Sequence, residues 1–273
     1  MVLLVGTLVF FPVVLALVRS LYDWSPGTRE EFIGLDNFRE LVGSSTFREI
    51  AVNQLIFVIG APLWAGVPLL VAMLLHEKVP AAGLFRAIFF LPALLSPATN
   101  GILFRSLLRP DGGLNQVLES VGLGGLAMRW IDDPVLVKPV IILVVLWFSM
   151  GFGVVIYSAA LSTVDPALME AAQIDGATWA QRTYYVLVPR IIPIFALNVI
   201  FSVATAFQLF PYAYLLTSGG PGYASTSLDY DIYENALGAG YFGLAAAESV
   251  FLLIFMGIIM AGAAMISRRK WVQ

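Results

Sequence analysis

The chain of 273 residues contains no cysteine and a single histidine, His76. Without cysteine it can form no disulfide framework, no iron–sulfur cluster and no thiol nucleophile. One histidine is a poor basis for a metal site or for a Ser-His-Asp set. Charged residues make up only 12% of the chain, the net charge is −3, and no basic cluster suggests nucleic acid. We therefore expect neither a bound metal nor a nucleic-acid partner.

Nucleotide-binding and catalytic motifs are also missing. The sequence contains neither G-x-x-x-x-G-K-[ST] nor G-x-G-x-x-G. No pair of carboxylates occupies a plausible pocket for acid–base work. These absences predict that the chain is not itself an enzyme and carries no cofactor of its own.

Apolar residues are what the sequence does contain, at 59% of the chain, with a mean hydropathy of +0.87. A helix of about 20 apolar residues crosses a bilayer. The pattern predicts an all-α integral membrane protein with one domain over 1–273. Six transmembrane helices are expected, near 2–22, 51–75, 87–108, 139–161, 191–216 and 242–266.

The first apolar segment could instead be a signal peptide. It lacks a charged n-region and a small-x-small cleavage site followed by a soluble domain, so we interpret it as a span. The chain opens almost inside this span, which suggests that a short cytoplasmic leader is missing.

Residues 161–193 form a long polar stretch between two apolar runs. Asp165 followed by Pro166 is typical of a helix start, because the aspartate caps and the proline needs no N–H in the first turn. Gly176 suits the left-handed residue that closes such a helix. The pattern predicts a first helix over 167–175.

A second helix is expected after this glycine. Thr178, with Gln181 three residues later, has the pattern of a capping box. We expect this helix to stop near Val188, because Pro189 disfavours a helix before it. On the residues alone, the segment could be a surface hairpin that only joins two spans.

The hairpin sequence also resembles a known motif. Glu170-Ala171-Ala172, Gly176 and Pro189 match the E-A-A-x3-G-x9-I-x-L-P loop of ABC-importer permeases, with V-L-V-P as a conservative change at the end. The text EAAQIDG is similar to the carbohydrate-uptake, MalF-like class. Three more motifs of that class follow the chain in order, at 32–38 (FIGLDNF), 83–92 (GLFRAIFFLP) and 216–222 (LTSGGPG).

The resemblance implies a type I ABC importer permease fold with six spans and a cytoplasmic helical hairpin. It implies a heterodimer with a second permease, two ATP-binding subunits that hold ATP and Mg, and an extracytoplasmic binding protein. Glu170 would pair with a basic residue of the ATPase. The residues implied for ATPase coupling are Glu170, Ala171, Ala172, Asp175, Gly176 and Pro189. Those implied for contact with the binding protein are Gly219, Gly220, Pro221 and Gly222.

Orientation rests mainly on the resemblance. Lysine and arginine are similarly frequent on both sides of the predicted spans, so the positive-inside rule does not decide. The cluster Arg268-Arg269-Lys270 after the last span favours the cytoplasm, and the resemblance places the coupling loop 162–190 there. We expect a multi-pass protein of the prokaryotic plasma (inner) membrane with both termini cytoplasmic.

Polar residues follow one face of the fifth predicted span. At about 100° per residue, such a stripe does not face lipid, so it lines either a pathway or a helix–helix contact. The candidates for the translocation path on this span are Asn198, Ser202, Thr205, Gln208 and Tyr212.

Glu248 is the acid predicted inside a span, and it is a further candidate for the pathway. A charge at mid-membrane is costly. The carboxyl group could face a wet cavity, or it could be protonated or snorkelling.

Two other functions remain open on the residues. An ion-coupled secondary transporter would need mid-membrane ionisable groups and usually an internal repeat, and the sequence offers one such acid and no repeat. A membrane-embedded enzyme lacks a catalytic set. The resemblance favours an importer of a carbohydrate or a related polar solute, without identifying which.

Overall fold

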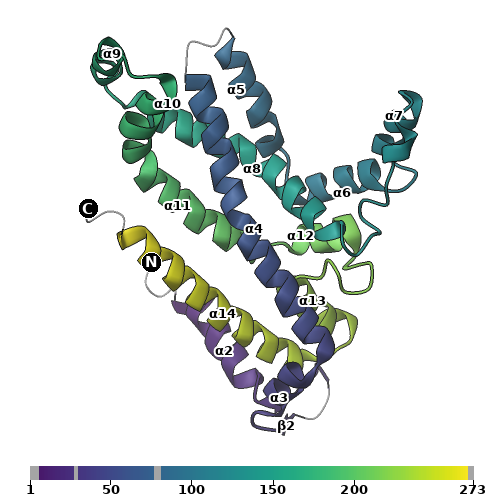
Figure 1. Ribbon diagram of the computed structural model, residues 1–273. Helices are drawn as coiled ribbons and strands as arrows, with labels where there is room; N and C mark the ends of the chain where they lie inside the picture. Colours follow the sequence, from purple (N-terminus) through teal and green to yellow (C-terminus); the bar gives the residue numbers. More distant parts are fainter. Residues whose placement is uncertain (1–5, 28–29, 77–80, 270–273) are drawn as a thin grey trace.

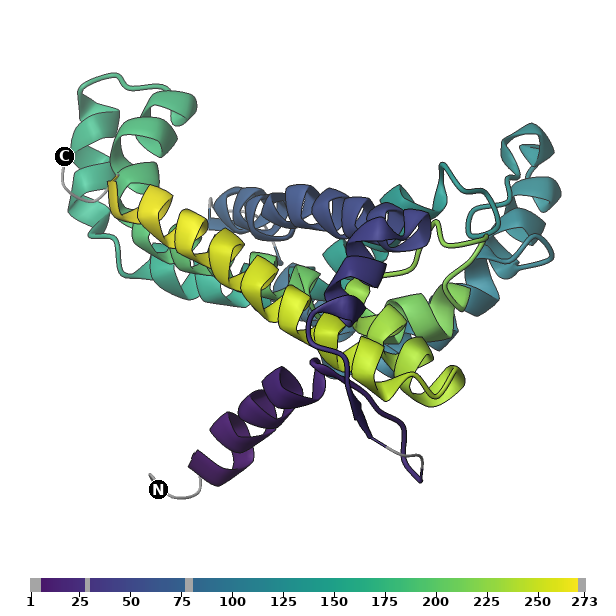
Figure 2. The same ribbon diagram turned by 90° about the horizontal axis from the view of Figure 1, so that it is seen from below.

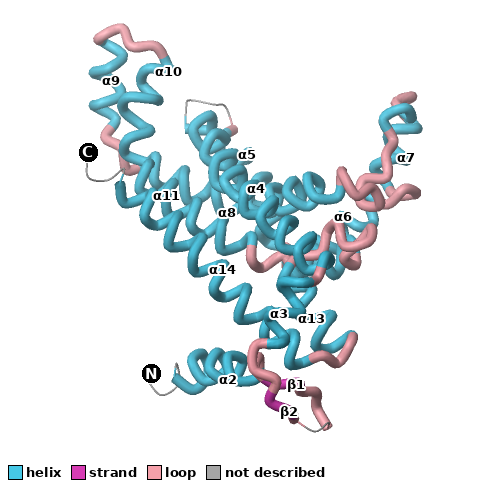
Figure 3. Tube along the Cα trace, turned by 60° about the horizontal axis from the view of Figure 1, so that its bottom comes forward, coloured by secondary structure: helices cyan, strands magenta, loops and turns pink. Residues whose placement is uncertain are grey.

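The computed structural model describes residues 6–27, 30–76 and 81–269. Nearly all of its regular structure is helical, as the tube in Figure 3 shows. The strands β1 (Tyr22–Asp23) and β2 (Glu31–Phe32) pair antiparallel, with Tyr22 opposite Phe32. The prediction of an all-α membrane protein is confirmed.

The helical elements follow one another along the whole chain. In order they are η1 (Gly6–Phe10), α2 (Phe11–Arg19), α3 (Asp36–Gly43), α4 (Ser45–His76), α5 (Ala82–Phe90), η2 (Leu91–Leu94), α6 (Pro97–Leu108), α7 (Gly113–Ser120), η3 (Gly124–Leu126), α8 (Val137–Ser162), α9 (Pro166–Ile174), α10 (Trp179–Arg182), η4 (Thr183–Leu187), α11 (Val188–Ala206), α12 (Phe210–Tyr212), η5 (Ala213–Thr217), α13 (Leu228–Tyr233), η6 (Glu234–Gly238) and α14 (Phe242–Arg269).

Four helical stretches of the described chain are long and apolar enough to cross a membrane. They are Ser45–His76, Val137–Ser162, Trp179–Ala206 and Phe242–Met265. The shorter apolar stretch Gly6–Arg19 lies in the first predicted span, whose residues 1–5 are outside the described residues.

The packing centres on α4 and α8, which cross in the middle of the molecule (Figure 1). Their backbones come close where Gly153 lies against Pro68, since a Cβ on this glycine would be 2.4 Å from the proline Cβ. Small residues allow such close approach between membrane helices. The Trp64 indole N–H donates to the Ile142 carbonyl at 2.9 Å, which ties the same pair of helices.

The third predicted span, near 87–108, is not one straight helix. The chain bends by 99° between Gly83–Leu94 and Pro97–Ser120. Pro97 cannot donate a backbone N–H, and the residue before a proline avoids helix, so a new helix starts here. The Ser96 hydroxyl caps it by accepting from the Thr99 N–H at 3.1 Å.

The fifth predicted span, near 191–216, is also divided. Helix α11 ends at Ala206, and α12 begins at Phe210 before the proline at position 211. At its other end, α11 continues the hairpin. The expectation that the second hairpin helix stops near Val188 is wrong, because the π-helical turn η4 carries the chain into α11 and Pro189 lies in its first turn, where no N–H is needed.

The two ends of the molecule differ in content. The hairpin α9–α10 projects at one end, and the carboxyl end of α14 points toward it (Figures 1 and 2). The β1–β2 pair, α3 and α13 lie at the other end, where α4 and α14 begin. The coupling-loop candidates and the segment 207–241 therefore occupy opposite ends.

Candidate functional site

A cavity lies where α11 is interrupted. It has a volume of about 530 Å³ and includes Thr205, Gln208 and Tyr212 in its lining. The remaining lining residues are Pro97, Phe148, Phe207, Phe210, Pro211 and Asp229. Three of the five stripe residues are thus brought to one cavity, which also has aromatic walls.

The stripe itself does not continue along one helix. Because α11 ends at Ala206, the helical spacing that placed Gln208 and Tyr212 on the face of Asn198 and Ser202 no longer applies beyond that residue. Asn198 donates to the Ile194 carbonyl at 3.2 Å, and Ser202 is buried; neither lines this cavity. The prediction of one continuous face is corrected to a cavity at a break.

Two buried polar side chains near this break are only loosely paired. Tyr212 Oη and both amide atoms of Asn100 make no hydrogen bond of normal geometry among the described residues, although the Asn100 amide interacts with the Tyr212 hydroxyl. Such groups are costly when they stay unpaired. Both side chains are enclosed by protein, at 2% and 0% exposed, where α12 packs on α6.

Asp229 holds the wall of the cavity where α12 meets α13. Its carboxylate accepts from the Phe210 N–H at 2.6 Å, the Ser227 hydroxyl at 2.5 Å and the Tyr230 N–H at 3.0 Å. Burial raises the pKa of Asp229 above its usual range, and these hydrogen bonds oppose the shift. The carboxyl group therefore fixes the start of α12 against α13.

Sequence reasoning missed two residues of α4 that anchor this region. The buried Asn53 amide donates to the carbonyls of Tyr223 (2.8 Å) and Thr226 (3.2 Å). Gln54 donates to the Ala206 carbonyl at 2.6 Å and accepts from the Leu228 N–H at 3.3 Å. The sequence does contain a signal for them, because Asn53 and Gln54 are two adjacent amide residues in an otherwise apolar predicted span.

Glu248 lies outside the cavity. It is fully buried on α14, and its Oε2 accepts from the Asn235 amide at 3.0 Å. Protein encloses the side chain in this structure. It contacts the chain between α13 and α14.

The glycine-rich loop is folded tightly rather than extended. Gly219 is buried with φ +77°, and a Cβ there would lie 2.7 Å from Tyr230 Cε1. The Ser225 hydroxyl bonds to Thr217 Oγ1 (2.7 Å) and the Gly220 carbonyl (2.8 Å). Of the predicted contacts Gly219, Gly220, Pro221 and Gly222, only Gly222 is exposed.

The structure of the hairpin at the other end agrees with the helix caps and the glycine turn predicted from its sequence. Asp165 Oδ1 caps α9 by accepting from the Ala167 N–H at 2.9 Å, and Gly176 has φ +80°. Thr178 and Gln181 form a complete capping box. Most residues predicted for ATPase coupling are exposed, namely Glu170, Ala171, Asp175, Gly176 and Pro189, whereas Ala172 is half-buried. The neighbouring apolar residues Ile174, Tyr184 and Tyr185 are exposed as well.

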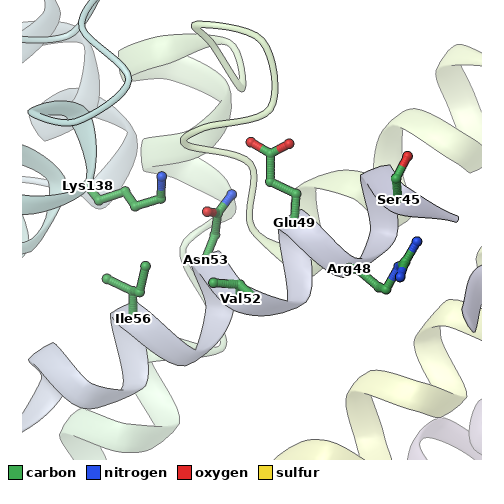
Figure 4. A pocket seen from close by; sticks show the side chains of 7 residues that line it. All are labelled: Ser45, Arg48, Glu49, Val52, Asn53, Ile56 and Lys138. Atoms are coloured by element: carbon green, nitrogen blue, oxygen red, sulfur yellow. The ribbon is translucent and has the colours of Figure 1, made fainter.

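A second groove, of about 390 Å³, lies at the start of α4 (Figure 4). Lys138 extends from α8 toward the side of α4 that carries Glu49 and Asn53, while Arg48 points the other way. This groove is open and carries charges of both signs. It therefore suits contact with a charged surface rather than enclosure of a solute.

Comparison with known proteins decides the family. Residues 7–272 match the family described as binding-protein-dependent transport system inner membrane component. The chain belongs to this family. The resemblance found in the motifs is confirmed, and the ion-coupled alternative is set aside.

Relatives of this permease are similar along most of its length. A probable ABC transporter permease protein, YurN of Bacillus subtilis, is 32% identical over 90% of this chain and 86% of its own. The lactose transport system permease protein LacF of Rhizobium radiobacter is 31% identical over 94% and 87%. The sn-glycerol-3-phosphate permease UgpA of Pectobacterium atrosepticum is 29% identical over 92% and 86%.

Solved structures support the same fold. A bacterial ABC transporter involved in the import of the acidic polysaccharide alginate aligns with a TM-score of 0.83 at 25% identity, covering 98% of this chain and 92% of that chain. The alginate transporter in complex with its pentasaccharide-bound periplasmic protein gives 0.84, over 98% and 91%. The predicted type I importer permease fold is confirmed by these neighbours.

Proposed function

We propose that this permease forms, with a second permease subunit, the pathway for a sugar or sugar-like solute in an ATP-driven importer. The observation that carries the proposal is the cavity at the break of α11. Its lining combines hydroxyl and amide groups, which hydrogen-bond sugars, with aromatic walls against which sugar rings pack. Relatives named for lactose and sn-glycerol-3-phosphate support a polar, hydroxyl-rich substrate.

The chain has no catalytic role in this proposal. ATP and Mg are bound by two ATPase subunits, and the hairpin α9–α10 is the element that docks on them. Its exposed Glu170 supplies a charge for a basic partner group, while Ile174 and Trp179 supply exposed apolar area (86% and 43% exposed). A cleft that receives both would bury a desolvated ion pair and an apolar contact.

Both termini are assigned to the cytoplasm together with the hairpin. The carboxyl end of α14 points toward the hairpin end, which supports this orientation (Figure 1). The segment 207–241 then faces the extracytoplasmic binding protein. Within its glycine loop, Gly222 is the exposed position that we assign to that contact.

Cysteine accessibility tests the pathway, because the chain has no cysteine of its own. Single cysteines at Thr205 and Gln208 should react with a membrane-impermeant thiol reagent in at least one nucleotide state of the assembled transporter. The control is Phe201→Cys on the exposed apolar surface of α11 (68% exposed), which lipid should shield in every state. If Thr205 and Gln208 react no faster than Phe201, the cavity does not belong to the pathway.

The binding-protein contact has its own test. Gly222 has φ +58°, and a Cβ added there would meet no atom within 4 Å, so Gly222→Asn keeps the turn while adding a polar side chain. Loaded binding protein should then stimulate ATPase activity less, with basal activity unchanged. Full stimulation would argue against contact at this loop.

A further inference from the structure

The groove at the start of α4 holds two charged side chains of opposite sign that have no ionic partner. Glu49 lies one turn before Asn53 on α4, and Lys138 extends from α8 toward the same side of that helix (Figure 4). Among the described residues, neither Glu49 nor Lys138 forms an ion pair. Elsewhere in the described chain, a nearby carboxylate pairs with each of Arg19, Arg39, Arg109 and Arg129.

The arrangement of these two charges suits a partner that enters from outside. The groove between them has a volume of about 390 Å³, and Glu49 is exposed while Lys138 is half-buried. A carboxylate placed beside Lys138 and a cation placed beside Glu49 would match both walls. Charge complementarity of this kind selects the partner and speeds its association more than it adds affinity.

The groove is continuous with the glycine-rich loop. Asn53, which lines the groove, donates to the Tyr223 carbonyl at 2.8 Å. The Tyr223 side chain is 49% exposed and follows Gly222, the position assigned to the binding-protein contact. A typical interface covers about 800 Å² of each partner, which is enough to include both the loop and the groove.

We propose that this groove is the charge-selective part of the docking surface for the extracytoplasmic binding protein. An acidic side chain on the rim of that protein pairs with Lys138, and a basic side chain pairs with Glu49. The inference rests on the proposed function, which assigns the segment 207–241, and with it the start of α4, to the side of the binding protein.

Titration of the assembled transporter with loaded binding protein tests this surface. Lys138→Glu places a negative charge opposite the expected acidic group, so the concentration that gives half-maximal ATPase stimulation should rise about tenfold at low salt. Glu49→Lys should give a similar rise from the other wall. Both differences should shrink near about 0.5 M salt, where the Debye length falls to about 4 Å.

Arg48→Glu is the matched control. Arg48 points to the other side of α4 (Figure 4), and its Nε donates to the Ser44 carbonyl at 3.3 Å. This variant should change the half-maximal concentration by less than about twofold, as should Lys138→Arg, which keeps the charge. No rise in Lys138→Glu, or an equal rise in Arg48→Glu, would overturn the proposal.

Other occupants of the groove would give different results. If the second permease filled it, Lys138→Glu would reduce recovery of that subunit in co-purification. If a lipid headgroup filled it, the half-maximal concentration would follow the headgroup charge of the nanodisc lipids rather than the residue at position 138. Either result would overturn the proposal while leaving the proposed function intact. A wild-type transporter that loaded binding protein does not stimulate would overturn both.

Discussion

The hairpin 162–190 and the segment 207–241, which we assign to the outer side, are held in different ways. The hydrogen bonds of the hairpin lie within itself: the Asp165 cap, the capping box of Thr178 and Gln181, and a bond from Arg182 to Gln173 at 3.3 Å. Its apolar base, with Val164 and Leu187, packs on α4 and α8. Its outward side chains are left free to contact another protein.

The outer segment is stabilised from elsewhere in the chain. Asn53 and Gln54, more than 150 residues away in sequence, bind its backbone at Tyr223 and Leu228, and Glu248 binds the Asn235 side chain from α14. In its loop, the residues from Ala224 to Ser227 are all buried. The hydrogen bonds of one end of the molecule are therefore local, whereas those of the other end join it to the membrane helices.

Gln54→Leu should break the outer segment most strongly. The substitution keeps the approximate volume but leaves the buried Ala206 carbonyl and Leu228 N–H unpaired, at about 1–3 kcal/mol each. The free energy of unfolding in detergent should fall by about 2–6 kcal/mol. Gln116→Leu, on exposed α7, is the control and should change it by less than about 0.5 kcal/mol. If both substitutions lowered the free energy of unfolding equally, Gln54 would not anchor the segment to α4.

Gly219→Ala should be the next largest change. The left-handed backbone costs about 1–2 kcal/mol for an L residue, and the new methyl group collides with Tyr230 at 2.7 Å. Gly222→Ala has the same backbone cost with no neighbour within 4 Å, so it is the matched control. Thermal unfolding should show the Gly219 variant to be clearly less stable than the Gly222 variant. The reverse order would contradict the packed loop.

Thr178→Ala should have a small effect confined to the hairpin. Loss of an N-cap costs about 1 kcal/mol, so hydrogen exchange over 179–187 should speed up about fivefold while exchange over 223–230 stays unchanged. A change in both segments would contradict the independence of the two ends.

The same contrast explains how much the sequence could predict. The hairpin can be predicted nearly residue by residue, because caps and a left-handed glycine are local signals. Its one wrong boundary, at Val188, arises because a π-helical turn lets Pro189 join the first turn of α11.

The outer segment is harder to predict because its partners are distant. Helical spacing joins Tyr212 to Asn198, but the chain leaves the helix at Ala206, where Gln54 takes the free carbonyl. Likewise, Glu248 is paired with Asn235 across a turn that no local pattern marks. The structure of the segment 207–241 is therefore decided by contacts with residues distant in sequence, rather than by local helix propensity.

The central claim is that the hairpin docks on an ATPase subunit through Glu170. The direct measurement is co-purification of the ATPase subunits with tagged permease carrying Glu170→Lys, next to Glu119→Lys, which reverses the same charge on exposed α7. A desolvated ion pair whose partner is replaced by a like charge loses about 3–5 kcal/mol, so ATPase recovery should fall to background for Glu170→Lys only. Wild-type recovery for Glu170→Lys would contradict the account.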